Sequence, residues 1–249
     1  MKLYLGSRDY RPEGFLTVDM DPTHNPDILS DVTDLKAIES ASVDEICASH
    51  ILEHMPWPQS FKALAEWTRV LRVGGQLSVA VPDLGLLARL ITEGRNVWGA
   101  TGLLFGVGRL ENALEAHQYG YTRDMLIGLL RSLGFDSFEW WKHDVPDASN
   151  GWIMDDAGER IAISLNIAAK KVGRPVVEPE ELLHELMNDR LQPFDKILGR
   201  LVASNADRPP PTAEHDPLLV QQLHMALIEA RMRILYLESE IISMRKATT

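Results

Sequence analysis

Cysteine is almost absent from this sequence: Cys47 is the only one among 249 residues. A lone cysteine excludes an intramolecular disulfide framework and a zinc site built on several cysteines. The chain also lacks an apolar signal-peptide core and any run of about 18 apolar residues, so we expect no membrane span. The simplest expectation from these absences is a cytoplasmic protein.

Basic residues are scarce, with 25 Lys and Arg against 36 Asp and Glu, which gives a formal net charge of -11 at pH 7. Binding to a phosphate backbone requires basic surface, and no block of Lys and Arg interleaved with aromatic residues occurs. We therefore expect no nucleic-acid partner and favour a small, neutral or hydroxyl-bearing substrate. With 45% hydrophobic residues, the chain is long enough for one sizeable core with appendages.

Short apolar segments that end in acidic or small polar residues dominate the first third of the chain. In order these are "LYLGS", "FLTVDM", "LSDVTDL", "SVDEICASHILEH" and "RVLRVGGQLSVAVPD". Together, over roughly residues 1–171, they resemble the cofactor half of class I S-adenosylmethionine-dependent methyltransferases, in a short-loop form similar to methyltransferase type 11. The resemblance implies an α/β fold: a Rossmann-like, doubly wound, mostly parallel sheet of seven strands.

The resemblance also implies the cofactor, S-adenosylmethionine, and the residues that would bind it. Asp19 corresponds to the carboxylate that accepts hydrogen bonds from both ribose hydroxyls, which suits its two acceptor oxygens. Asp31 corresponds to the residue beside the adenine, where the backbone N–H of Val32 meets a ring nitrogen. The full expected set is Leu5, Gly6, Ser7, Arg8, Asp19, Met20, Asp31, Val32, Ser49 and His50.

The connection between the first two expected strands is unusually short, because only Gly6 to Gly14 separate them. A parallel crossover that includes a helix needs about ten to twelve residues or more, so we predict that this helix is missing or reduced to a turn. A dinucleotide requires a helix N-terminus at its pyrophosphate, which disfavours a nucleotide-sugar enzyme that uses a dinucleotide. S-adenosylmethionine carries a carboxylate instead; Arg8 or Arg11 is a candidate to bind it, unless both are solvated loop residues.

Methyl transfer to oxygen requires a base, and three residues are candidates for the catalytic site. His50 directly follows the fourth expected strand, and its alternative role is to hold that turn in shape. His117, in "AHQYGYTRD", lies where the resemblance places a loop over the cofactor, and its alternative is a solvated or capping residue. Asp83 lies at the end of the fifth expected strand. Its side chain is either a partner of the substrate hydroxyl or a helix cap.

His54 shares a face with His50 if a helix has begun at that point. A divalent metal on this pair is the alternative, but no obvious carboxylate ligand is recognised at a fixed spacing from it, so we expect no metal site.

Several further elements follow from periodicity. We predict a helix from about Ser60 to Arg72 that "VGG" ends, a helix from Thr122 to Phe135, and closing strands at Phe135–Trp141 and Arg160–Lys170. Residues 84–116 are expected to form a lid or substrate wall. Trp140 and Trp141 are either core residues or a platform for a sugar ring.

The last third of the chain divides into three further segments after the methyltransferase-like residues 1–171. We predict a helical extension at 172–206, a Pro-rich linker at 207–217 and a coiled-coil helix at 218–246. Apolar residues from Val220 to Met244 recur at alternating spacings of three and four, which favours a parallel homodimer, with a trimer still open. A lone amphipathic helix packed on the domain is the alternative.

The function that the sequence favours is S-adenosylmethionine-dependent O-methylation of a sugar or glycan hydroxyl in polysaccharide biosynthesis, an acceptor that the resemblance alone implies. Two alternatives stay open. The acceptor is another small metabolite, or the domain is a catalytically idle scaffold within an assembly.

Overall fold

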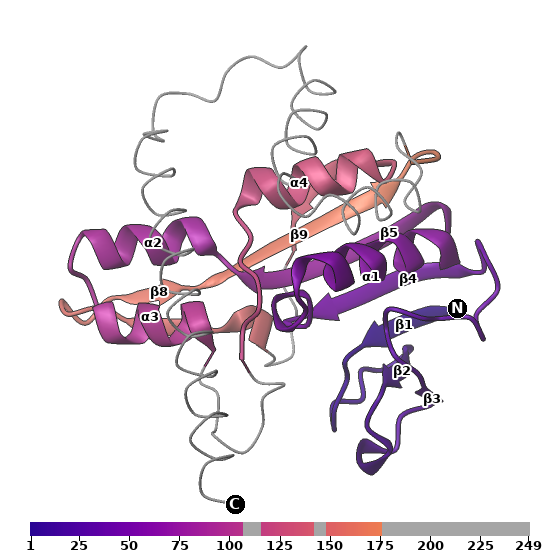
Figure 1. Cartoon of the computed structure of the whole chain (residues 1–249), viewed down its shortest axis with the longest axis horizontal. Coiled ribbons are helices and arrows are strands. Elements are labelled where there is room, and N and C mark those ends of the chain that lie inside the picture. Colours follow the sequence, from indigo (N-terminus) through magenta and orange to yellow (C-terminus); the bar gives the residue numbers. More distant parts are fainter. Residues whose placement is uncertain (107–115, 142–147, 176–249) are drawn as a thin grey trace, which may run out of the picture. The chain divides into compact units, whose positions relative to one another are not determined.

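The computed structural model describes residues 1–106, 116–141 and 148–175 (Figure 1). Within these ranges seven strands form one sheet in the order β3-β2-β1-β4-β5-β9-β6. Their bounds are β1 Lys2–Leu5, β2 Leu16–Asp19, β3 Ile28–Leu29, β4 Val43–Ser49, β5 Leu71–Pro82, β6 Phe135–Trp140 and β9 Ser164–Lys171. The first five strands pair in parallel, whereas β9 is antiparallel to both of its neighbours, β5 and β6. The expected mostly parallel sheet of seven strands is confirmed.

The strand order reverses at β1, which lies between β2 and β4. In open α/β sheets of this kind, ligands bind in the crevice outside the carboxyl ends of the strands at such a switch point. The fold therefore directs attention to the residues that follow β1, β2 and β4.

Four α-helices occur in the described residues: α1 (Trp57–Val70), α2 (Leu84–Thr92), α3 (Val97–Phe105) and α4 (Arg123–Ser132). Helix α1 contacts β5, and α4 contacts β6 and β9 (Figure 1). The core between helices and sheet is apolar, and its largest fully buried side chains include Trp67, Tyr121, Phe61, Leu3, Leu5, Ile46, Leu64 and Leu77. The second halves of β4 and β5 are mostly apolar and buried, as expected for central strands of a sheet that is covered on both faces.

The predicted shortening of the first crossover is confirmed, because the segment from Gly6 to Phe15 contains turns and no helix. The connection from β3 to β4, residues 30–42, is likewise built from turns. Helix α1 fixes this second segment through Trp67, whose indole donates to a backbone carbonyl there, and through Glu66 and Arg69. Among the residues before Asp83, α1 is thus the only α-helix.

Helix α1 starts and ends earlier than predicted. It runs from Trp57 to Val70, and β5 begins directly at Leu71. The glycine pair does not end the helix. Instead, Gly74 (φ 79°) lies in an irregular start of β5, where the pairing with β4 shifts register.

The expected strand from Arg160 to Lys170 is two strands. Its first part, β8 (Arg160–Ala162), pairs with β7 (Trp152–Met154) in a separate two-stranded sheet. Its second part, β9, joins the main sheet. Ile163 separates them, because its backbone bonds the loop at Gly151 and the end of β5 at Asp83 instead of continuing either ladder.

Within residues 84–106 of the expected lid, helices α2 and α3 lie side by side (Figure 1). Residues 107–115 lie outside the described chain. The two helices pack around Leu87, Leu90 and Ala100, with Ile153 of β7 and Ile161 of β8 against this cluster. This small apolar cluster lies beside the main core and is distinct from it.

The predicted helix after Thr122 is confirmed as α4. Thr122 caps it by accepting a 3.4 Å hydrogen bond from the Met125 N–H, and Gly134 (φ 85°) ends the turn that follows. The helical extension beyond residue 175, the linker at 207–217 and the coiled coil at 218–246 lie outside the described residues. In the described ranges, no helix has the length and apolar character that a membrane crossing requires.

Candidate functional site

The candidate site lies at one edge of the sheet, where the carboxyl ends of β1, β2, β4 and β5 meet. Gly6, Asp19, His50 and Asp83 occupy or directly follow those strand ends. Because β9 is antiparallel, its first residue, Ser164, lies at the same edge. Residues from distant parts of the sequence are therefore brought together by strand direction alone.

Asp19 is a fixed carboxylate at the end of β2 and is only 7% exposed. Its Oδ2 accepts a 2.8 Å hydrogen bond from the backbone N–H of Arg8, and its Oδ1 accepts a 3.0 Å bond from that of Asp21. A carboxylate can accept about four hydrogen bonds, so each oxygen retains acceptor capacity. The side chain is oriented by the fold and is still able to receive a ligand hydroxyl.

Gly6 brings the loop after β1 close to the turn after β4. Its backbone has φ 64°, and its N–H donates a 2.8 Å bond to the Val18 carbonyl. A Cβ at this position would lie 2.5 Å from Cδ1 of Ile51. Both the conformation and the close approach require glycine here. Ser7, the next residue, is also buried.

The two candidate arginines of the first loop differ in their roles. Arg8 is exposed at φ 45°, and its backbone rather than its side chain contacts Asp19. The Arg11 guanidinium donates to the carbonyls of Arg8 at 2.7 Å and Asn25 at 3.0 Å, and also to that of His24. Arg11 therefore braces the short loop against the segment after β2, which is a structural task.

The other expected cofactor residues differ in how exposed their side chains are. Leu5 is fully buried in β1, whereas Met20 is 61% exposed. Asp31 is exposed and its Oδ1 accepts a 2.8 Å bond from the Thr33 N–H, while Val32 is buried. The Asp31 turn presents its carboxylate to solvent on a segment anchored in the core.

Both ring nitrogens of His50 have a close polar neighbour. Its Nδ1 lies 2.9 Å from Oε1 of Glu53, and its Nε2 lies 2.9 Å from Oγ of Ser164. The residue has φ 52°, and its N–H donates to the Ala80 carbonyl at 2.9 Å. The imidazole is thus fixed between two groups that can exchange protons with it. The Oγ of the preceding Ser49 is buried.

Glu53 is a central residue of this edge that the sequence analysis missed. It lies in a 3₁₀ turn, η2 (Leu52–His54), and is 1% exposed. Its backbone carbonyl accepts bonds from the N–H groups of Gln118 at 2.6 Å and Tyr119 at 3.1 Å, which ties the loop before α4 to η2. In the sequence, Glu53 is the acidic residue of "SHILEH". The pattern of that segment did not predict that its side chain would be buried.

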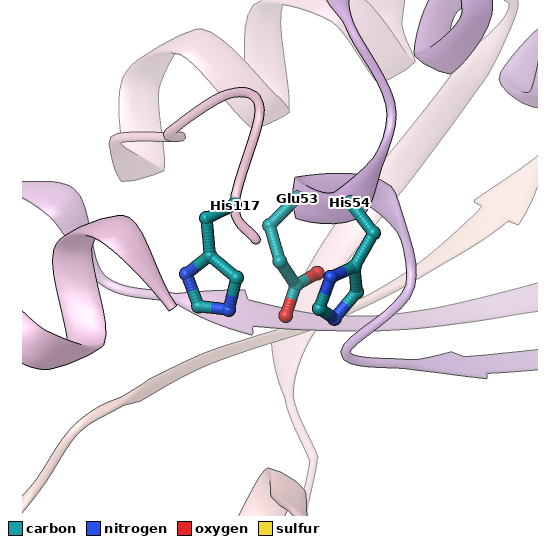
Figure 2. Close-up of side chains that lie close together, drawn as sticks. All are labelled: Glu53, His54 and His117. Carbon is teal, nitrogen blue, oxygen red and sulfur yellow. The ribbon is translucent and has the colours of Figure 1, made fainter. Parts of the chain in front are cut away.

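Glu53, His54 and His117 form a cluster (Figure 2), in which each offers one ligand atom within 4.8 Å of the others. The imidazole rings of His54 and His117 meet edge to face, with centroids 5.0 Å apart. Burial lowers the pKa of His117 below its ordinary value, which favours the neutral ring. His54, expected beside His50, thus joins His117.

Asp83 caps a helix. Its Oδ1 accepts a 3.1 Å bond from the Leu86 N–H at the start of α2, and its own N–H donates to Ile163. Tyr121 pairs with Asp83 through the backbone and is fully buried. Burial raises the pKa of the Tyr121 phenol, so it stays protonated at neutral pH. The helix-cap alternative considered for Asp83 is the role that these contacts display.

Residues 12–79 match a family model described as a methyltransferase domain. The matched stretch begins in the loop after β1, extends into β5, and includes Asp19, Asp31 and His50. This match supports a methyltransferase domain whose cofactor is S-adenosylmethionine.

Solved structures with a similar fold include two S-adenosylmethionine-dependent methyltransferases. One, from Methanosarcina mazei, is 16% identical, with 69% of this chain and 92% of that chain covered and a TM-score of 0.44. The other, from Archaeoglobus fulgidus, is also 16% identical, with 68% and 85% covered and a TM-score of 0.47. The sequence matches no curated protein.

Proposed function

We propose that this chain transfers a methyl group from S-adenosylmethionine to a hydroxyl group of a sugar or glycan. The observation that carries the proposal is the Asp19 carboxylate, which is buried, oriented by two backbone N–H groups and located at the switch point of the sheet. A cis-diol needs two fixed acceptor oxygens, and Asp19 supplies them.

The rest of this edge suits S-adenosylmethionine better than a dinucleotide. The loop after β1 has no helix, and so it has no helix N-terminus to offer to a pyrophosphate. S-adenosylmethionine contains no phosphate, so its binding does not require a helix N-terminus there. The anchored turn at Asp31 and Val32 lies beyond β3, where it is the candidate contact of the adenine.

Methyl transfer is an in-line displacement on a carbon that the sulfonium already activates, so positioning supplies much of the rate. A hydroxyl acceptor also has to lose its proton. We assign this to His50, which has the Glu53 carboxylate beside Nδ1 and the Ser164 hydroxyl in contact with Nε2. In this assignment Nε2 takes the proton directly or through the Ser164 hydroxyl.

The choice of a sugar acceptor is supported by charge and by an exposed aromatic ring. The net charge of -11 disfavours an anionic polymer. Trp140 ends β6 at the same edge of the sheet and is 61% exposed, whereas its neighbour Trp141 is anchored through its Nε1, which donates to the Val79 carbonyl at 3.1 Å. A tryptophan offers a broad apolar face with a polar edge, which suits a sugar ring.

Calorimetric titration with S-adenosylhomocysteine tests the cofactor site. We expect binding by the wild type and a loss of roughly 10- to 100-fold in Asp19→Asn, because the amide replaces an acceptor oxygen with a donor and removes the charge. Glu13→Gln, which removes the same charge at an exposed position in the loop before β2, should bind as the wild type does. Failure of the folded wild type to bind would overturn the proposal and favour the scaffold alternative.

The acceptor is tested with a panel of monosaccharides, nucleotide sugars and oligosaccharides, with hydroxylated metabolites as a comparison. Turnover is measured as S-adenosylhomocysteine released and as methylated product. His50→Asn, chosen because asparagine tolerates a positive φ, should lose turnover and keep S-adenosylhomocysteine binding. Methylation of metabolites alone would reject the sugar acceptor and leave the cofactor site standing.

A further inference from the structure

The cluster of Glu53, His54 and His117 has the composition of a metal site. Its three ligand atoms lie within 4.8 Å of one another, and they come from two elements, the η2 turn and the loop before α4 (Figure 2). We propose that these residues bind a divalent transition-metal ion. Two imidazoles and one carboxylate suit ions such as Zn²⁺ or Fe²⁺ better than Ca²⁺ or Mg²⁺, which prefer oxygen ligands throughout.

Glu53 has a buried carboxylate that a bound metal ion would compensate. The side chain is 1% exposed, and the basic group beside it is Nδ1 of His50, 2.9 Å from its Oε1; in the described part of the chain no lysine or arginine pairs with it. Neither carboxylate oxygen makes a contact with hydrogen-bond geometry within those residues. A buried carboxylate needs a compensating cation, and the groups that surround it are metal-ligating imidazoles.

The cluster is already in place before any ion binds. The Glu53 carbonyl accepts hydrogen bonds from Gln118 and Tyr119, and the His117 N–H donates to the Phe105 carbonyl at 2.9 Å. These bonds hold the loop of His117 against the turn of Glu53 and His54. A site whose ligands are held by the backbone loses little conformational freedom on binding an ion.

The histidines are also prepared as ligands. The His117 ring hydrogen-bonds the backbone of Leu103, which is the second contact that metal-bound histidines commonly make and which leaves the other nitrogen for an ion. The Nδ1 of His54 is buried and has no hydrogen-bond partner in the described residues. Figure 2 shows a ring nitrogen of each histidine on the side of the Glu53 carboxylate.

An ion at this position would be adjacent to the proposed base, because Oε1 of Glu53 lies 2.9 Å from Nδ1 of His50. Three protein ligands leave coordination positions open, and a hydroxyl bound there would have a lowered pKa. This role in catalysis rests on the proposed methyl transfer to a hydroxyl, whereas the binding of the ion does not.

The test uses the full chain after treatment with a chelator. Titration with Co²⁺, followed by its visible absorption, and calorimetric titration with Zn²⁺ should give one tight site. We expect His54→Gln and His117→Gln each to weaken binding by about tenfold or more, because each removes one ligand. The control is His24→Gln, which removes a histidine that contacts Asp9 and Asp21 outside the cluster. Equal affinity in the wild type and both cluster variants, or no binding by the wild type, would overturn the proposal.

Thermal unfolding with and without Zn²⁺ keeps the test decisive if a variant is less stable. A ligand that binds only the folded state raises the unfolding temperature, so the wild type and His24→Gln should shift equally and His117→Gln should shift less. S-adenosylhomocysteine titration of the same proteins separates the two proposals. Cofactor binding without metal binding rejects the ion alone, and metal binding without cofactor binding rejects the methyltransferase alone.

Discussion

The indole Nε1 of Trp67 donates a 3.0 Å hydrogen bond to the backbone carbonyl of Val32. This buried bond joins α1 to residues 30–42, the connection from β3 to β4 that is built from turns. The same segment carries Asp31, the candidate adenine contact. A core tryptophan therefore sets the position of a candidate cofactor loop that has no helix of its own.

Trp67→Phe should weaken both stability and cofactor binding. The change leaves the Val32 carbonyl buried without a partner, which costs about 1–3 kcal/mol of unfolding free energy. We also expect S-adenosylhomocysteine affinity to fall several-fold, measured by calorimetry beside urea unfolding. Leu130→Ala, a buried change in α4 away from residues 30–42, is the control. It should destabilise the fold while affinity is retained, and an equal loss of affinity would contradict the link.

Glu66 should make stability depend on pH. It accepts hydrogen bonds from the Leu35 N–H at 3.0 Å and from Arg69 Nε at 2.8 Å, and the Arg69 guanidinium is the main cause that lowers the pKa of Glu66. Because the folded pKa lies below the unfolded one, the stabilisation is present above about pH 4.5 and is lost as pH falls through the folded pKa.

The measurement for Glu66 is urea unfolding at a series of pH values from 7 down to about 3, across the titration range of a carboxyl group. Glu66→Gln should lower stability at neutral pH and flatten its decline in the acidic range, because the titrating group is gone. Glu13→Gln should follow the wild-type curve. Parallel curves for Glu66→Gln and wild type would show that the pair with Arg69 does not contribute.

Strand ends were predictable from the sequence because topology determines where they lie. Parallel strands place their carboxyl ends at one edge, so Gly6, Asp19 and His50 follow from recognising three apolar segments and their order. The shortened crossover was equally predictable, because the length of chain between two strands limits what fits between them.

Contacts between distant segments were not predictable in the same way. The contact of His50 with Ser164 depends on β9 running antiparallel and starting after Ile163, whereas the sequence suggested one unbroken strand from Arg160. The meeting of Glu53 and His117 depends on backbone bonds from the loop before α4. No periodicity encodes these bonds, because they join irregular segments whose packing is decided by the whole core.

Gly6→Ala should be more destabilising than the matched change Gly14→Ala. Both glycines have positive φ, 64° and 79°, which costs an alanine about 1–2 kcal/mol. Only Gly6 faces a neighbour, since its added Cβ would lie 2.5 Å from Cδ1 of Ile51, whereas Gly14 has open space. We expect this overpacking to add roughly 1–3 kcal/mol and to reduce S-adenosylhomocysteine affinity.

A second change tests the cause at Gly6. Ile51→Val removes the Cδ1 atom that the new Cβ would meet, so the double variant should recover much of the overpacking cost in urea unfolding, though not the cost of the positive φ. Strictly additive effects of the two substitutions would mean that the loop after β1 shifts away instead of pressing on the turn after β4.

Substitutions at Asp83 distinguish a structural role of this carboxylate from a catalytic one. Asp83→Ala removes the cap of α2 and should cost about 0.5–2 kcal/mol, while Asp83→Asn keeps an acceptor oxygen for the Leu86 N–H and should cost little. Because the carboxylate is already engaged by α2, we expect the asparagine variant to retain methyl transfer within a few-fold. A loss of about 100-fold or more would instead make Asp83 a participant in proton transfer. His50 would then share that task, and the acceptor would have to lie beyond the carboxyl ends of β4 and β5, within reach of both side chains.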